Sequence, residues 1–246
     1  MNIPNTANSF EELHEFFNGV PSQKYIWLYR GQANASWKLK PKIGRDEYNV
    51  GGTGLDRFRA WKSKAVAHIN LPNNEWEQLA IAQHYGLSTF LLDWSENPLV
   101  AAFFACHECP DQDGVVYIHA PGKIIDYNII KSPFYIDDAL RDGFNDFPPS
   151  LAFYPNAIDK RIINQKGVFT IHSTPQEELK SYEIFDPNLK DNLYALRIKS
   201  EAKKDVLDKL HIYGIDNHFL FPDLGGLSEF INYETRGIIE GRKRVK

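Results

Sequence analysis

The sequence is poor in cysteine and has no excess of positive charge. Only two cysteines occur among 246 residues, so disulfides cannot provide the framework of the fold. A chain of this length buries roughly 70% of its unfolded surface, so stability requires no structural metal. The net charge of −4 gives no overall positive field. Bulk binding to nucleic acid or to an anionic membrane is therefore not expected.

Long hydrophobic runs are also missing. A membrane-spanning helix needs roughly 18 to 20 apolar residues, and the longest approach to this is the segment 98–106. The N-terminal residues lack the charged, apolar and small-residue order of a secretory signal. We therefore expect a cytoplasmic protein with no membrane partner. The only dense basic run, 241–246, is typical of a solvated tail.

What is present indicates one α+β domain over residues 1–246. Hydrophobic residues make up 43% and charged residues 24% of the chain, which is ordinary globular composition. Helical spacing and capping signals predict helices at 10–17, 55–69, 73–85, 94–106 and 202–213. Aromatic and β-branched runs predict strands at 25–29, 37–40, 114–119, 167–172 and 192–198. We expect a mixed or antiparallel sheet flanked by helices, with a proline-rich flexible insertion or lid at 134–157.

The most informative polar residues are Tyr29-Arg30-Gly31-Gln32, which begin at the last residue of the apolar run 25–29. We expect the strand to end near Arg30 and to present it at an edge. Glycine lets a ligand approach the backbone, and the planar guanidinium suits phosphate or carboxylate. Gln32 adds an adjustable donor and acceptor. The site predicted here binds a small anionic ligand; a structural pairing of Arg30 with a carboxylate is the alternative.

A second candidate pair is His84 and Asp93, which flank one short connection. Imidazole changes charge near neutral pH, and a carboxylate can fix its tautomer, so the pair could act in general acid–base catalysis. The architectural alternative places His84 at a helix end closed by Gly86. In that alternative Asp93 is the N-cap of the helix 94–106.

Two further segments carry candidate residues. Arg161 and Gln165 stand just before the strand 167–172, where ligand groups can be presented; solvated charges at a sheet edge are the alternative. Cys106 and Cys109 have the spacing of half a zinc site or of a redox pair. The second half of such a site is missing from the sequence, so no metal is expected.

Taken together, six separated motifs resemble the FRG domain over about residues 10 to 235. In chain order they are Tyr-Arg-Gly-Gln at 29–32, Gln-His-Tyr-Gly-Leu-Ser-Thr at 83–89, Leu-Leu-Asp-Trp-Ser at 91–95, Ala-Ala-Phe-Phe-Ala at 101–105, the segment 161–169, and Phe-Pro-Asp-Leu-Gly-Gly-Leu at 221–227. Phe90 and Gly225 depart from the family pattern, which often has arginine and an acidic residue there. The resemblance implies an α+β domain of bacterial and phage-related proteins.

The strand-borne Tyr-Arg-Gly is also similar to the first motif of Arg-type ADP-ribosyltransferases. That similarity implies that Arg30 and Gly31 hold NAD and that a late glutamate assists glycosidic cleavage. Glu229 is the first candidate, with Glu234 or Asp223 as substitutes. The leading hypothesis is an NAD-binding ADP-ribosyltransferase or NAD-cleaving enzyme of toxin or defence type, acting on a protein target. The alternatives are a noncatalytic nucleotide- or nucleic-acid-binding module and a protein-interaction domain.

Overall fold

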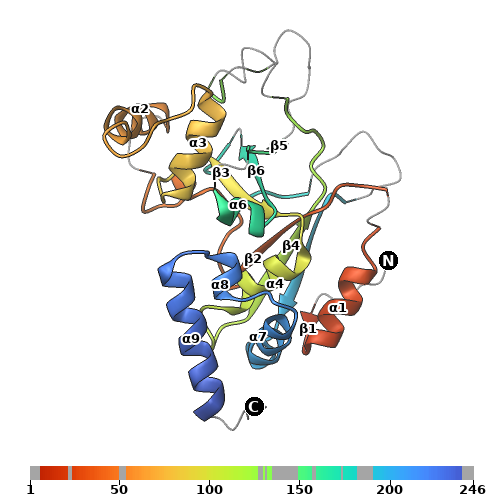
Figure 1. Ribbon diagram of the computed structural model, residues 1–246. Coiled ribbons are helices and arrows are strands. Elements are labelled where there is room, and N and C mark those ends of the chain that lie inside the picture. Colours follow the sequence, from red (N-terminus) through yellow and green to blue (C-terminus); the bar gives the residue numbers. More distant parts are fainter. Residues whose placement is uncertain are drawn as a thin grey trace.

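The computed structural model of this chain describes residues 6–21, 24–49, 54–126, 130, 132–134, 149–156, 159–172, 174–181 and 191–239. These ranges contain eight α-helices, two 3-10 turns and seven strands (Figure 1). The helical elements are α1 (Phe10–Asn18), η1 (Lys42–Gly44), α2 (Gly54–Ala65), α3 (Glu75–His84), α4 (Pro98–Cys106), α6 (Lys160–Asn164), η2 (Ser200–Ala202), α7 (Lys203–Ile212), α8 (Asn217–Leu220) and α9 (Leu224–Ile239). The strands are β1 (Thr6–Ala7), β2 (Leu28–Gln32), β3 (Leu91–Ser95), β4 (Gly114–His119), β5 (Ser150–Phe153), β6 (Gly167–His172) and β7 (Leu193–Ile198).

The strands form one open, mixed sheet in the order β1-β7-β4-β2-β3-β6-β5. Among the described strands, only β1 and β7 run parallel, and every other neighbouring pair is antiparallel. This confirms the predicted single α+β domain. None of the described helices is both long enough and apolar enough to cross a bilayer.

The sheet is joined unevenly at its centre. β2 pairs with β4 along its whole length, from Leu28 to Gln32. Between β2 and β3, in contrast, only Tyr29 and Ser95 are paired. The two described strands therefore separate beyond that pair, and side chains rather than ladder hydrogen bonds must fill the space between them.

Helix α4 covers one face of the sheet at this central point. Its apolar side chains, among them Val100, Ala101 and Ala105, join a core that also contains residues of α1, α7 and β4. A second core, under α2 and α3, contains Trp76 and Phe153 and packs on β5 and β6. In Figure 1, α2 and α3 lie at the end of the sheet that carries β5 and β6, whereas α4 lies over its centre. The first core includes Tyr29 of β2 and the second includes Leu91 of β3, so both cores help to hold these strands in place.

The predicted start of the helix near Trp94 is wrong, and so is the prediction that Asp93 caps it. Asp93 is the central residue of β3, which pairs with β6 from Leu91 to Ser95. Helix α4 begins four residues later, where the side chain of Asn97 accepts a hydrogen bond from Leu99 N at 3.0 Å. An Asn cap followed by a proline in the first turn is the stronger start signal.

Two other predicted elements also differ. Residues 37–40 form no strand; instead the backbone of Leu39 bonds to Glu178 and Leu179 of a neighbouring loop. The predicted insertion 134–157 includes the buried edge strand β5, so that part belongs to the sheet. Residues 135–148 and the basic tail 241–246 lie outside the described residues.

Candidate functional site

A cavity of about 380 Å³ opens where β2 and β3 separate. Its walls come from β2, β3, the first half of β6, the end of α3, α4, and α6. Seven of the nine residues predicted from the sequence line it: Tyr29, Arg30, Gly31, His84, Asp93, Arg161 and Gln165. Segments more than 130 residues apart in the chain thus converge on one site.

Arg30 lies in the middle of β2, not at a strand end as predicted, because the ladder with β4 continues through Gln32. Its side chain is only 15% exposed and spans the gap between the strands. Nη1 donates to the carbonyl oxygen of Asp93 at 2.6 Å and lies 3.6 Å from Asp93 Oδ2. Nε is buried and has no hydrogen-bond partner among the described residues. Burial lowers the pKa of Arg30, and the nearby carboxylate partly offsets this.

Asp93 supplies the carboxylate beside Arg30. Its side chain is 56% exposed, and Oδ2 accepts a hydrogen bond from Gln83 Nε2 at 3.0 Å. A carboxylate placed between a guanidinium and an amide donor is held in one orientation. Sequence reasoning did not assign a role to Gln83, although this residue directly precedes His84 in one of the quoted motifs.

The structure pairs His84 with Asp159 rather than with Asp93. His84 Nε2 lies 3.7 Å from Asp159 Oδ2, and the imidazole packs edge-on against Tyr85. His84 and Asp93 still line the same cavity. The contact with Asp159 bridges 75 positions of the chain, and no local pattern around either residue indicates it.

Arg161 and Gln165 lie on the other side of the cavity, at α6. Asp159 caps this helix by accepting from Arg161 N at 2.6 Å. The Arg161 guanidinium stacks over the ring of Phe221 at 4.5 Å, and Gln165 Nε2 donates to Leu220 O at 3.0 Å. Burial lowers the pKa of Arg161, and the carboxylate of Asp93 partly offsets this. The Phe-Pro-Asp-Leu-Gly-Gly segment thus supports the second guanidinium of the site.

Gly31 is required by close packing as well as by its position in the cavity wall. A Cβ atom on Gly31 would lie 1.9 Å from Ala101 O and 2.6 Å from Ala105 N of α4. Such distances are far below any carbon–oxygen or carbon–nitrogen contact. The glycine therefore lets α4 approach β2, which in turn places the start of α4 at the cavity.

Two predicted residues are not brought to this cavity. Gln32 is buried on β2, and its Oε1 has no partner among the described residues. Glu229 lies on α9, as expected for a helical residue, and its carboxylate is 3.8 Å from Arg236 Nη2. It lines a separate cavity of about 840 Å³ between α4, α7 and α9. The structure therefore does not place Glu229 beside Arg30.

The cysteine pair lies at the end of α4. Cys106 is buried, and burial raises the pKa of its thiol to about 12. In the described part of the chain, no three His, Cys, Asp or Glu residues are grouped so that they could hold a metal ion. A thiol with so high a pKa is a poor nucleophile and a poor metal ligand at neutral pH.

Comparison with known proteins finds one family match, which lies in the first half of the chain. Residues 25–114 match the family model of the FRG domain. Over these residues the chain is similar to the FRG domain. The matched range includes Arg30, His84 and Asp93 but ends before Arg161 and Gln165. No curated protein and no solved structure matches the chain.

Proposed function

We propose that the cavity between β2 and β3 binds the phosphate groups of a nucleotide, that this nucleotide is NAD, and that the protein breaks its nicotinamide–ribose bond. The observation that carries the proposal is the convergence of Arg30, Arg161 and Asp93 on one cavity. Two cations and one carboxylate match a ligand that has a negative diphosphate and, at the reacting carbon, a developing positive charge.

Binding is the better supported part of the proposal. Arg30 is largely buried yet keeps one N–H group, at Nε, without a partner among the described residues. An unpaired buried donor costs free energy, which a ligand oxygen or a water molecule would recover. Charge-assisted hydrogen bonds to phosphate are stronger still in a site partly shielded from water. The cavity volume of about 380 Å³ lies within the range of small-ligand sites.

The chemistry assigned to Asp93 is electrostatic. When the bond between ribose C1′ and nicotinamide N1 breaks, its electron pair leaves with nicotinamide and C1′ becomes an oxocarbenium ion. A carboxylate close to C1′ lowers the energy of that ion. A water molecule, or a nucleophile of a protein target, then forms the new bond to C1′ and loses a proton to solvent. In this proposal Asp93 takes the role for which the sequence analysis named Glu229 as the first candidate.

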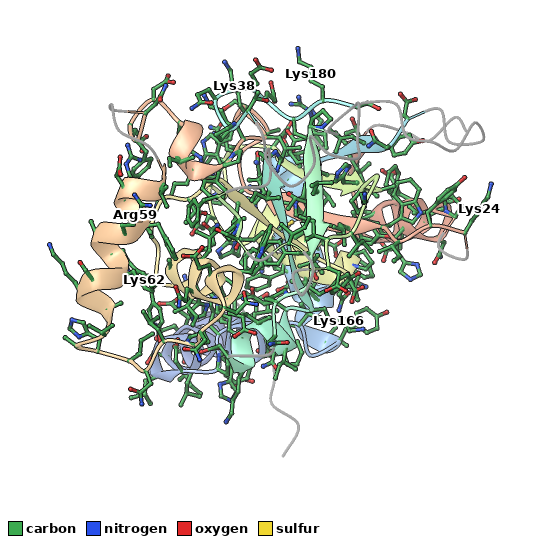
Figure 2. The ribbon with its side chains drawn as sticks, turned by 90° about the horizontal axis from the view of Figure 1, so that it is seen from above. Lys24, Lys38, Arg59, Lys62, Lys166 and Lys180 are labelled. Carbon is green, nitrogen blue, oxygen red and sulfur yellow. The ribbon has the colours of Figure 1, made fainter. Side chains whose placement is uncertain are left out.

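A noncatalytic nucleotide-binding module is the second candidate. It is favoured by the existing contacts of Asp93, whose Oδ2 already accepts from Gln83 and lies near Arg30. An extended nucleic-acid surface has less support. Figure 2 labels six cations that lie at separate places over the molecule; these are Lys24, Lys38, Arg59, Lys62, Lys166 and Lys180.

The two candidates are separated by Asp93→Asn, which keeps the shape of the side chain and the backbone carbonyl bound by Arg30. Nicotinamide release is followed by chromatography, and NAD binding by calorimetry. We expect release to fall by about 100-fold or more, with NAD affinity changed less than about threefold. NAD binding without any release by the wild type supports the noncatalytic module. A wild type that shows no NAD binding and no nicotinamide release overturns both candidates for NAD.

A further inference from the structure

A chain of hydrogen bonds runs from the backbone of β3 through two side chains to the carboxylate of Asp93. Leu91 N donates to Thr89 Oγ1 at 3.1 Å, and Thr89 Oγ1 donates to Gln83 Oε1 at 2.6 Å. Gln83 Nε2 then donates to Asp93 Oδ2 at 3.0 Å. The chain links the end of α3 to β3 across the connection between them.

Each link has a fixed direction. The Leu91 N–H can only donate, so Thr89 receives that bond and keeps its own proton for another acceptor. Thr89 is 2% exposed, so the Gln83 carbonyl oxygen is the acceptor within reach. An ionised carboxylate can only accept, so the NH₂ end of Gln83 must face Asp93. A flipped Gln83 amide would place two oxygens together and leave the threonine proton unpaired.

This chain of hydrogen bonds also determines which oxygen of Asp93 remains available to a ligand. Gln83 Nε2 and Arg30 Nη1 both approach Oδ2, at 3.0 and 3.6 Å. No described residue forms a hydrogen bond to Oδ1, although the Asp93 side chain is 56% exposed and lines the cavity. Oδ1 is thus the oxygen free to contact a ligand in the cavity.

We propose that Gln83 and Thr89 are positioning residues that hold Asp93 with Oδ1 directed to the reacting carbon of the substrate. This inference rests on the proposed NAD cleavage. Neither residue bonds to the phosphate-binding guanidinium of Arg30 or Arg161. Loss of these hydrogen bonds therefore lowers the rate of the chemical step and leaves binding of the diphosphate nearly unchanged.

The test compares four variants with the wild type: Gln83→Met, Thr89→Val, Thr89→Ser and the double variant Gln83→Met with Thr89→Val. Gln83 is only partly buried, so Gln83→Met keeps the length of the side chain without disturbing a core. Thr89→Ser keeps the hydroxyl, whereas Thr89→Val keeps the shape and removes it. The kcat and KM of nicotinamide release are measured for each, with thermal unfolding as a check on folding.

We expect Gln83→Met and Thr89→Val each to lower kcat about tenfold, with KM within about twofold of the wild type. Thr89→Ser remains within about twofold in both. Because Thr89 acts through Gln83, adding Thr89→Val to Gln83→Met causes no further loss of kcat.

Three results would overturn the inference. Losses that multiply in the double variant show that the two residues act separately. A Gln83→Met protein that keeps the wild-type kcat shows that Asp93 needs no such support, while the proposed NAD cleavage stands. A wild type that releases no nicotinamide removes the proposed reaction and the positioning role with it.

Discussion

Replacement of Gly31 by alanine tests whether α4 must lie against β2. The added Cβ would be 1.9 Å from Ala101 O and 2.6 Å from Ala105 N, both backbone atoms of α4. An ordinary contact at Ala101 would require α4 to retreat by roughly 1.5 Å, since such contacts begin near 3.4 Å. Both alanines are buried in the main core, so the shift would loosen packing along the whole helix.

The expected cost is about 3 kcal/mol or more, at the upper end of values for overpacked cores. For a domain of this size, that lowers the melting temperature by roughly 6 to 12 °C. The assay is thermal unfolding followed by circular dichroism. Gly167→Ala is the matched control, because Gly167 also lies in a strand and lines the same cavity, and its nearest contact would be 3.5 Å. Equal stability of the two variants would refute the reasoning.

Three further predictions concern buried polar groups. Lys203 Nζ donates to three backbone carbonyl oxygens, so Lys203→Met should lower the free energy of unfolding by about 3 kcal/mol in denaturant titrations. Burial lowers the pKa of His119 to about 4 and that of His172 to about 3. Below about pH 6.5 these two histidines therefore take up protons in the unfolded chain but not in the folded one. The free energy of unfolding consequently falls by about 2 kcal/mol per histidine between pH 7 and pH 5. Finally, a thiol-reactive disulfide reagent should label partly exposed Cys109 and spare Cys106 in the folded protein, because burial raises the pKa of Cys106 to about 12.

Each of these predictions has a control. Lys204→Met removes an exposed neighbouring ammonium and should leave stability within about 0.5 kcal/mol. His119→Gln should reduce the pH dependence of unfolding, whereas His68→Gln, on the surface, should not. Stability that stays constant between pH 7 and pH 5 contradicts the histidine argument. Labelling of Cys106 and Cys109 at one rate contradicts the argument from burial.

The sequence predicts elements well where local signals are strong. The strands at 114–119 and 167–172 have the predicted bounds, because each is a β-branched, apolar run that begins at a glycine. The first helix begins at Phe10 because Ser9 accepts from Glu12 N, as the capping pattern predicts. These features depend on residues within one turn or one strand.

The errors arise where distant segments decide the structure. Arg30 was expected at a strand end because its own side chain interrupts an apolar run, yet pairing with β4 continues the strand through it. Asp93 resembles a helix cap in isolation, but pairing with β6 makes it a strand residue. The partner of His84, Asp159, is fixed by the packing of α6 against β6, which no local pattern encodes.

The most direct test of the central claim is calorimetry. It compares the affinity of the wild type and of Arg30→Ala for NAD and for ADP-ribose. Arg59→Ala is the control, because Arg59 is exposed on α2 and does not line the cavity. We predict that Arg30→Ala weakens binding of both ligands by about 10- to 100-fold and that Arg59→Ala leaves it unchanged. Equal affinity of all three proteins, or no binding by the wild type, would contradict the assignment of this cavity as a nucleotide site.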